Sequence, residues 1–188
     1  MSPTYHEVID YEKAYGHGVV YFWREYGEVA DYLSQWYPAI WEHEGIVYKS
    51  AEMWMMIQKA KLFEDEDIVL KMKATSNPGE HKRLGRKVKE YDGKKWNEHK
   101  QGIVEEGNMH KFLRSKEAPE LSRKLLETGD KLLVEASPFD RIWGIGFDAA
   151  QADNNWSEWG ENLLGKALMR VRARIRQMEA EQSVEANA

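Results

Sequence analysis

Cysteine is missing from the 188 residues, and its absence excludes several kinds of chemistry. Without cysteine the chain forms no disulfide bond, offers no thiolate nucleophile and cannot hold zinc through sulfur. The histidines do not fill this gap, because no pair of them has metal-ligand spacing with a third partner in view; they stand at positions 6, 17, 43, 81, 99 and 110. The sequence therefore predicts no metal site and no cofactor.

Long apolar runs are missing as well. No segment approaches the roughly eighteen consecutive apolar residues of a membrane helix, and the beginning of the chain lacks the apolar core of a signal peptide. We therefore expect no membrane contact and a cytoplasmic or nucleocytoplasmic protein that is not secreted. The chain also has no basic excess, since 27 basic and 32 acidic residues give a formal net charge of -5. Any contact with nucleic acid must then be local.

Motifs of the common nucleotide-binding and hydrolytic enzymes are absent too, because the chain contains no GxxxxGK[ST], GxGxxG, GxSxG or HExxH. It does contain 42% hydrophobic and 12% aromatic residues, which suffice for one sizeable core. We expect one domain at residues 19–176, preceded by an extension at 1–18. The polar residues 177–188 would follow as a fraying tail.

Local patterns predict an α+β fold that is mostly helical and surrounds a small β-sheet. β-Branched and aromatic runs predict short strands at 19–23, 45–48 and 131–136. Helix-forming stretches predict helices at 51–63, 64–75, 78–89, 96–114, 119–128 and from 159 onward, with Gly102 and Gly107 as points of interruption in the fourth. Ser50 and Asn77 are the expected N-caps of two of these helices.

Glu52 and Lys59 lie on one face of the first predicted helix, because seven residues make nearly two turns. Their Cβ atoms would be roughly 10 Å apart, so the two charged groups could bracket a ligand without forming a salt bridge. The alternative is that Glu52 simply favours the positive end of the helix dipole and that Lys59 is a surface residue.

Asp140 is the candidate in the irregular segment SPFDRIWGIGFD, which is too rich in Pro, Gly and aromatic residues for regular structure. Bulky apolar neighbours can tune such a carboxylate for catalysis. The alternative is that Asp140 caps a turn or pairs with Arg141. For Trp96 the alternatives are stacking on a ligand and filling the core. Arg86 is a candidate phosphate contact.

Several short blocks follow one another in a fixed order along the chain. Gly45-x-x-Tyr48-x-Ser50-Ala51-Glu52 opens a helix that carries Gln58-Lys59-Ala60. The later blocks are Pro78, Leu84-Gly85-Arg86, Lys95-Trp96, Lys111-Phe112, Leu125 to Gly129, Leu133-Val134-Glu135, Asp140 to Gly144 and Asn162 to Arg172. In this order the blocks resemble the NADAR, or YbiA-like, family over roughly residues 19–176. The chain departs from the family pattern at 33–36 and 53–56, where substrate selectivity is in question, and in an insertion at 149–156 that would border the pocket.

The resemblance implies a metal-independent N-glycosidase whose family members release ADP-ribose from the amino group of guanine in nucleic acid or nucleoside. It implies Glu52, Lys59 and Asp140 as catalytic residues. The expected substrate-binding residues are Trp96, Arg86, Trp143, Gly144 and Asn162. Two other functions stay open: an N-glycosidase acting on ribosyl intermediates of riboflavin synthesis, and a non-catalytic ADP-ribose or NAD-binding module.

Overall fold

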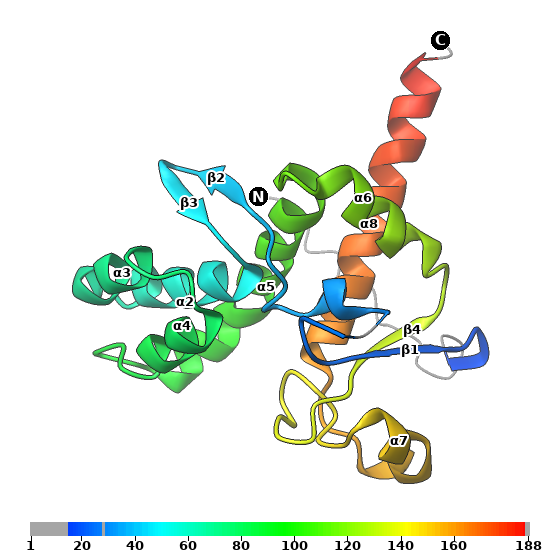
Figure 1. Cartoon of the computed structure of the whole chain (residues 1–188), viewed down its shortest axis with the longest axis horizontal. Helices are drawn as coiled ribbons and strands as arrows, with labels where there is room; N and C mark the ends of the chain where they lie inside the picture. Colours follow the sequence, from blue (N-terminus) through cyan, green and yellow to red (C-terminus); the bar gives the residue numbers. More distant parts are fainter. Residues whose placement is uncertain (1–14, 28, 187–188) are drawn as a thin grey trace. The chain divides into compact units, whose positions relative to one another are not determined.

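The computed structural model describes residues 15–27 and 29–186 and has a mostly helical α+β architecture (Figure 1). The described residues pack as two compact units, 15–22 with 126–186 and 23–125. Most of the expected extension at 1–18 lies outside the described residues. No helix within the described ranges is long and apolar enough to cross a membrane.

The first unit is built on a parallel pair of strands. β1 (Val19–Phe22) pairs with β4 (Leu132–Glu135), with Val19 opposite Leu132. The long helix α8 (Leu163–Ala186) packs on β4 through an apolar face that includes Leu164 and Leu168. Between strand and helix, the expected irregular segment is followed by the short helices α7 (Ala149–Ala152) and η2 (Asp153–Glu158).

The fraying expected from Gln177 onward is wrong for residues 177–186, because α8 continues as far as Ala186. Glutamate, glutamine and alanine favour helix even without a core to pack on. Gln177 also donates a hydrogen bond of 2.8 Å to Glu181, one turn later on the exposed surface. The polar composition at the end of the chain therefore indicates a solvated helix instead of a coil.

The second unit is organised around α2 (Ala51–Leu62), which packs against α3 (Glu66–Lys73), α4 (Pro78–Gly85) and α5 (Gly93–Arg114) (Figure 1). The turn η1 (Asp31–Leu33) precedes it, and α6 (Ala118–Glu127) follows α5. All seven residues from Ala51 to Ile57 are buried. A helix that is buried on every face over two turns forms the centre of a core.

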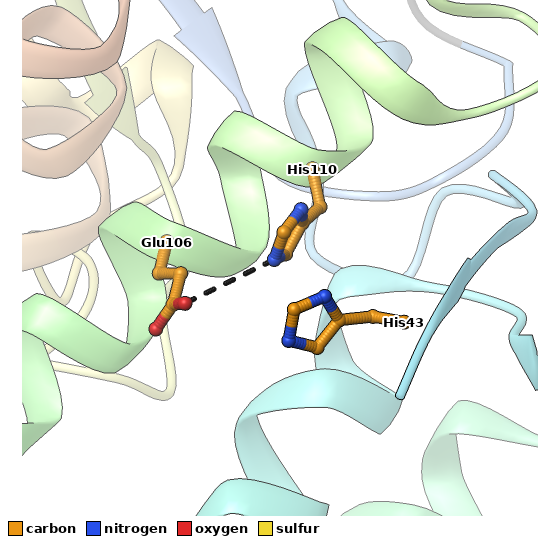
Figure 2. Close-up of side chains that lie close together, drawn as sticks. All are labelled: His43, Glu106 and His110. Atoms are coloured by element: carbon orange, nitrogen blue, oxygen red, sulfur yellow. Dashed lines mark ion pairs between the residues drawn. The ribbon is translucent and has the colours of Figure 1, made fainter. Parts of the chain in front are cut away.

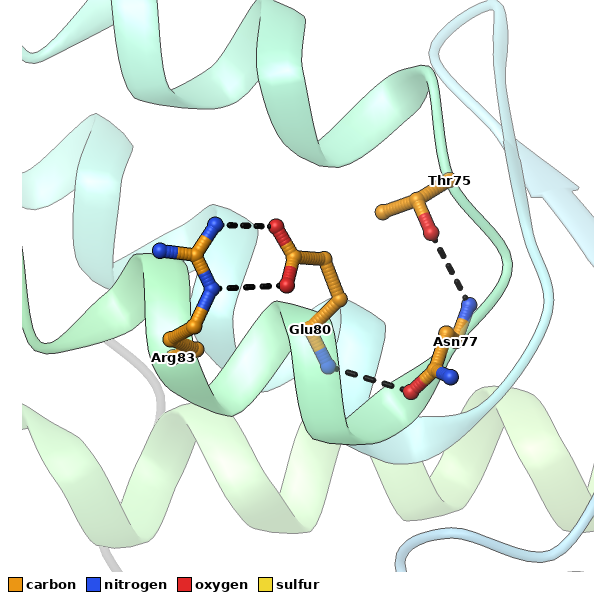
Figure 3. A network of polar contacts seen from close by, with 4 residues as sticks. All are labelled: Thr75, Asn77, Glu80 and Arg83. Atoms are coloured by element: carbon orange, nitrogen blue, oxygen red, sulfur yellow. Dashed lines mark hydrogen bonds and ion pairs between the residues drawn. The ribbon is translucent and has the colours of Figure 1, made fainter.

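Both expected N-caps are confirmed. The hydroxyl of Ser50 accepts a hydrogen bond of 3.2 Å from the amide of Met53. The side chain of Asn77 accepts one of 3.1 Å from the amide of Glu80, whose carboxylate in turn accepts hydrogen bonds from Arg83 (Figure 3). Each cap satisfies an amide that the first turn of a helix would otherwise leave unpaired.

The helix expected within 64–75 is confirmed as α3, but it does not continue the helix before it. The chain breaks at Glu64, whose φ of 57° is left-handed, and α3 restarts under the cap of Asp65. The carboxylate of Asp65 accepts from the amides of Ile68 and Lys89, so it joins the start of α3 to the segment after α4. α4 accordingly ends at Gly85, before the expected Lys89, whereas α5 runs without interruption through Gly102 and Gly107.

The expected single sheet is also corrected, because the described strands form two separate two-stranded sheets. In the second sheet, β2 (Trp41–His43) pairs antiparallel with β3 (Ile46–Tyr48). Glu44 and Gly45 form the turn, and both have positive φ, at 49° and 71°. Two left-handed residues are what a tight hairpin between right-twisted strands requires. The sequence reasoning missed β2.

Candidate active site

Glu52 lies in the first turn of α2 and is only 3% exposed. Its backbone amide donates a hydrogen bond of 2.9 Å to the carbonyl oxygen of Gln35, which fixes the start of the helix against the segment after η1. A carboxylate at this depth has lost most of its water, and it is retained where its charge has a partner or a function. The burial of Glu52 therefore supports a role beyond a favourable position in the helix dipole.

Lys59 stands nearly two turns further along the same helix and is half-buried. Its ammonium group donates a hydrogen bond of 2.9 Å to the carbonyl oxygen of Gly85. The same nitrogen lies 4.4 Å from the ring centre of Tyr91 and 5.5 Å from that of Trp96. Burial lowers the pKa of the Lys59 amine from its ordinary value. The alternative that Lys59 is an ordinary surface residue is therefore wrong.

The structure places Trp96 and Gly85 beside Lys59. Trp96 is buried, at 8% exposure, so most of its ring surface is covered and belongs to the core. Gly85 ends α4 where a side chain would overlap the sulfur of Met56 on α2. The next residue, Arg86, is exposed, and its side chain makes no hydrogen bond or ion pair with other described residues. Its guanidinium group is therefore accessible to an anion.

Asp140 lies in the first unit, in the irregular segment after β4, and is half-buried. One of its oxygens, Oδ1, accepts hydrogen bonds from the amides of Ile142 at 2.9 Å and Trp143 at 2.8 Å. The guanidinium of Arg141 instead donates to the carbonyl of Glu158. Asp140 thus caps its turn through Oδ1, and Oδ2 accepts no hydrogen bond from a described residue. A carboxylate that caps a turn through one oxygen can still take part in catalysis through the other.

Asn162 holds the Asp140 loop in place. It is buried and left-handed, with a φ of 49°. Its side chain accepts from the amide of Glu135 at 3.0 Å and donates to the carbonyl of Leu133 at 2.9 Å, and its own amide donates to the carbonyl of Gly144. Gly144 packs so closely that a Cβ would lie 2.7 Å from the carbonyl oxygen of Glu135. Both residues shape the loop.

The predicted residues thus fall into two sets, one in each unit. Glu52, Lys59, Arg86 and Trp96 belong to the second unit, with Glu52 and Lys59 on one helix face and Trp96 in contact with Lys59. The other set belongs to the first unit; it consists of Asp140, Trp143, Gly144 and Asn162.

Comparison with known proteins identifies the family. The sequence model of the NADAR domain matches residues 21–176, most of the chain and parts of both units. The chain belongs to the NADAR family. It is 44% identical over 149 residues to N-glycosidase R617 of Acanthamoeba polyphaga mimivirus, covering 74% of this chain and 85% of that protein. It is 33% identical over 162 residues to N-glycosidase Npun_R5314 of Nostoc punctiforme, covering 85% and 94%.

More distant similarities place the NADAR fold. The NMR structure of the Escherichia coli protein YbiA superposes with a TM-score of 0.70 at 24% identity, covering 87% of this chain and 88% of that one. The fold is therefore YbiA-like. The chain is also 28% identical over 158 residues to riboflavin biosynthesis protein VVA0006 of Vibrio vulnificus, where the match covers 84% of this chain but 39% of that protein.

Sequence reasoning missed the residues that support Glu52 in this NADAR protein. The side chain of Gln35 is buried and accepts a hydrogen bond of 3.0 Å from Asn108. Lys111 is fully buried and donates one of 2.7 Å to the carbonyl of Ser34, and burial lowers its pKa to about 7. Two signals were present in the sequence: Gln35 stands where the family pattern is altered, and Lys111 belongs to one of the blocks that resemble the family.

Sequence reasoning also missed a cluster of potential metal ligands, although their presence alone does not test the prediction of no metal site. His43, Glu106 and His110 each offer a ligand atom, and these atoms all lie within 4.8 Å of one another. Glu106 and His110 are one helical turn apart on α5, a spacing that was visible in the sequence. The third member comes from β2, far away in the chain, and no local pattern links it to the helix.

Proposed function

We propose that this NADAR protein is an N-glycosidase that hydrolyses the bond between ADP-ribose and the amino group of guanine in nucleic acid or nucleoside. N-Glycosidase activity is supported by two relatives of that name at 44% and 33% identity. The guanine-linked substrate rests on the family resemblance of the ordered motifs. We further propose that residues 19–176 form the catalytic domain.

The observation that carries the proposal is the placement of Glu52 and Lys59 on one helix. Breaking a ribosyl C–N bond builds positive charge at the anomeric carbon, and the nitrogen leaving group needs a proton. A buried carboxylate such as Glu52 suits the first demand, because it can stabilise the cationic centre or activate water. Burial strengthens this electrostatic interaction.

Lys59 offers a covalent version of the reaction. In the ring-opened substrate the anomeric carbon is joined to the guanine nitrogen as an imine. The neutral amine of Lys59 attacks this carbon, the bond to guanine breaks, and guanine leaves with the protons of the lysine amine. Water then hydrolyses the lysine imine and releases ADP-ribose. The lowered pKa of Lys59 supports this version, since only the deprotonated amine is a nucleophile.

Arg86 and Asp140 complete the proposal, each from its own unit. The exposed guanidinium of Arg86, at the end of α4, is suited to a phosphate of the ADP moiety. For Asp140 we propose assistance in proton transfer or orientation of the ribose hydroxyls. Its capped position supports this role, because the two amide hydrogen bonds hold Oδ1 in one orientation.

A second candidate substrate is a ribosyl intermediate of riboflavin synthesis. It is favoured by the similarity to the protein named riboflavin biosynthesis protein, although this chain spans 39% of that relative. The chemistry at the anomeric carbon would be the same. The substrate would lack the pyrophosphate-linked adenosine, and Arg86 would then have a smaller role.

One experiment separates these alternatives. Purified protein is incubated in parallel with an oligonucleotide ADP-ribosylated on guanine and with ribosylated pyrimidine precursors of riboflavin, and mass spectrometry follows free ADP-ribose and released base. Release of ADP-ribose from the oligonucleotide, abolished in Glu52→Gln, supports the proposal. Release only from the pyrimidine supports the second candidate. Binding of ADP-ribose without turnover of either substrate would identify a binding module.

A further inference from the structure

His43, Glu106 and His110 converge at the contact between the hairpin β2–β3 and helix α5. Figure 2 shows Glu106 and His110 on successive turns of α5, with the ring of His43 reaching toward His110 from β2. The ring centres of the two histidines are 4.6 Å apart. The three residues belong to the same unit, and their potential ligand atoms lie within 4.8 Å of one another.

His110 is the buried member of this cluster, at 6% exposure, and its Nε2 atom has no hydrogen-bond partner among the described residues. The carboxylate of Glu106 lies 3.9 Å from that nitrogen, too far for a hydrogen bond. Burial, together with the nearby His43 and Arg114, lowers the pKa of His110 to about 4.

An unpartnered buried nitrogen costs free energy unless something binds it. We infer that His43, Glu106 and His110 bind a divalent transition-metal ion of the zinc type. Two imidazoles and one carboxylate form the usual donor set for such an ion, with water at the fourth position. Bonds of about 2.0–2.2 Å from a central ion require the donor atoms to move slightly closer than they are here. Glu106 can do this, because its side chain is 58% exposed.

The charged residues around the cluster leave its ligand atoms available to a cation. Glu44 lies 3.8 Å from His43 but also pairs with Lys61 at 3.6 Å. Arg114 opposes a bound cation, whereas the carboxylates of Glu44 and Glu106 favour one. The remaining walls are aromatic, with Trp41 stacked on His110 and Trp54 edge-on to both histidines. Such walls exclude water and strengthen metal–ligand electrostatics.

The inferred ion is structural and does not take part in glycoside cleavage. Trp54, which contacts the cluster, is two residues from Glu52 on α2, and two residues correspond to a rotation of roughly 200° around a helix. The cluster is thus next to a different face of α2 from the one that carries Glu52 and Lys59. A bound ion would fasten β2 to α5, and its loss would loosen the hairpin without removing a catalytic group.

Isothermal titration calorimetry of Zn²⁺ into the full chain, freed of metal and of any affinity tag, tests the inference. We expect one saturable site and a higher melting temperature with Zn²⁺ bound. His43→Gln and Glu106→Gln should each weaken binding by about tenfold or more, since even the outer partners of metal ligands contribute that much. His99→Gln and Glu98→Gln are matched controls, because both residues are exposed on α5 outside the cluster.

Circular dichroism separates a loss of metal binding from a loss of folding in the variants. His43 and Glu106 are partly exposed, so their variants should retain the wild-type spectrum. His110→Asn removes the buried ligand and should abolish binding if it folds. Absence of saturable Zn²⁺ binding by the wild-type protein would overturn the inference. Binding that His43→Gln and Glu106→Gln leave as tight as the control variants would overturn it equally.

Discussion

The ammonium nitrogen of Lys59 donates a 2.9 Å hydrogen bond to the carbonyl oxygen of Gly85, where α4 packs tightly against Met56 of α2. The glycine therefore does two things: it admits the sulfur of Met56, and it presents its carbonyl to the amine. Helix packing and the position of the proposed nucleophile depend on the same residue.

Gly85→Ala should accordingly destabilise the protein by about 1–3 kcal/mol, the usual cost of overpacking a core, and should also lower turnover by moving the acceptor of Lys59. Urea denaturation and kcat measure the two effects. Gly102→Ala is the control, because a Cβ there meets nothing within 4 Å and alanine favours helix. Equal stability of the two variants would contradict the close packing at Gly85.

Glu52→Gln should keep the fold and lose about 100-fold or more in kcat, because the amide is nearly isosteric but cannot act as a base. Replacing a buried carboxylate by a neutral group should not lower stability greatly. The exposed Glu98→Gln serves as the control in the same assay. A rate for Glu52→Gln close to that of the control would reduce Glu52 to a residue of the helix start.

For Lys59, reduction with borohydride during turnover should attach an ADP-ribose-sized mass to the side chain. Lys59→Arg should then be inactive, because a guanidinium stays protonated. The adduct should form faster as the pH rises and level off below the ordinary lysine pKa, since burial lowers that of Lys59. If full turnover leaves no adduct and Lys59→Arg stays active, water attacks directly.

Turnover should survive removal of metal ions. No described metal-ligand cluster includes Glu52 or Lys59, and the cluster at His43 faces another side of α2. The rate measured with excess EDTA should equal the rate before treatment, even where the melting temperature falls. Loss of turnover in EDTA and its recovery with a divalent ion would disprove the carboxylate mechanism.

Stability should fall as the pH drops below about 6.5, the ordinary pKa of histidine, and His81 should contribute. Its Nε2 donates to the carbonyl of Met72, whereas Nδ1 is buried without a hydrogen-bond acceptor among the described residues. Burial lowers the pKa of His81. The unfolded chain thus binds the proton more readily, and acid favours unfolding.

Melting curves at pH 7.5 and 5.5 measure this dependence on pH. His81→Gln should be less stable at both values but should lose less on acidification than the wild type. The exposed His99→Gln should follow the wild-type dependence. An unchanged difference between the two pH values in His81→Gln would assign the acid sensitivity to other groups.

Contacts between residues close together in the sequence could be predicted, and contacts between distant residues could not. Ser50 and Asn77 cap their helices through amides three residues away, so the capping pattern needs no knowledge of the fold. The helix break at Glu64 was not predicted, because Asp65 is held partly by the distant amide of Lys89. β2 was not predicted, because one of its three residues, Glu42, has no preference for strands. The strand is stabilised by its pairing with β3.

The same distinction applies to the candidate site. The shared helix face of Glu52 and Lys59 followed from helical geometry alone, and the resemblance to a family raised both to catalytic candidates. The acceptor of Lys59 at Gly85 could not be predicted, since it depends on how two helices pack. Asn162 was expected to bind substrate, and that role stays a prediction. Its side-chain amide bonds to the backbone of β4, a partner that only the folded chain reveals.

The unbroken burial of α2 from Ala51 to Ile57 has a consequence for the energetics of the reaction. A helix enclosed on all sides cannot slide or rotate without opening the core, so the separation between Glu52 and Lys59 is set before any substrate arrives. The entropy of arranging these two groups is lost during folding and is not subtracted again at each catalytic cycle. Variants that merely soften this core, far from the substrate, should therefore slow the chemical step.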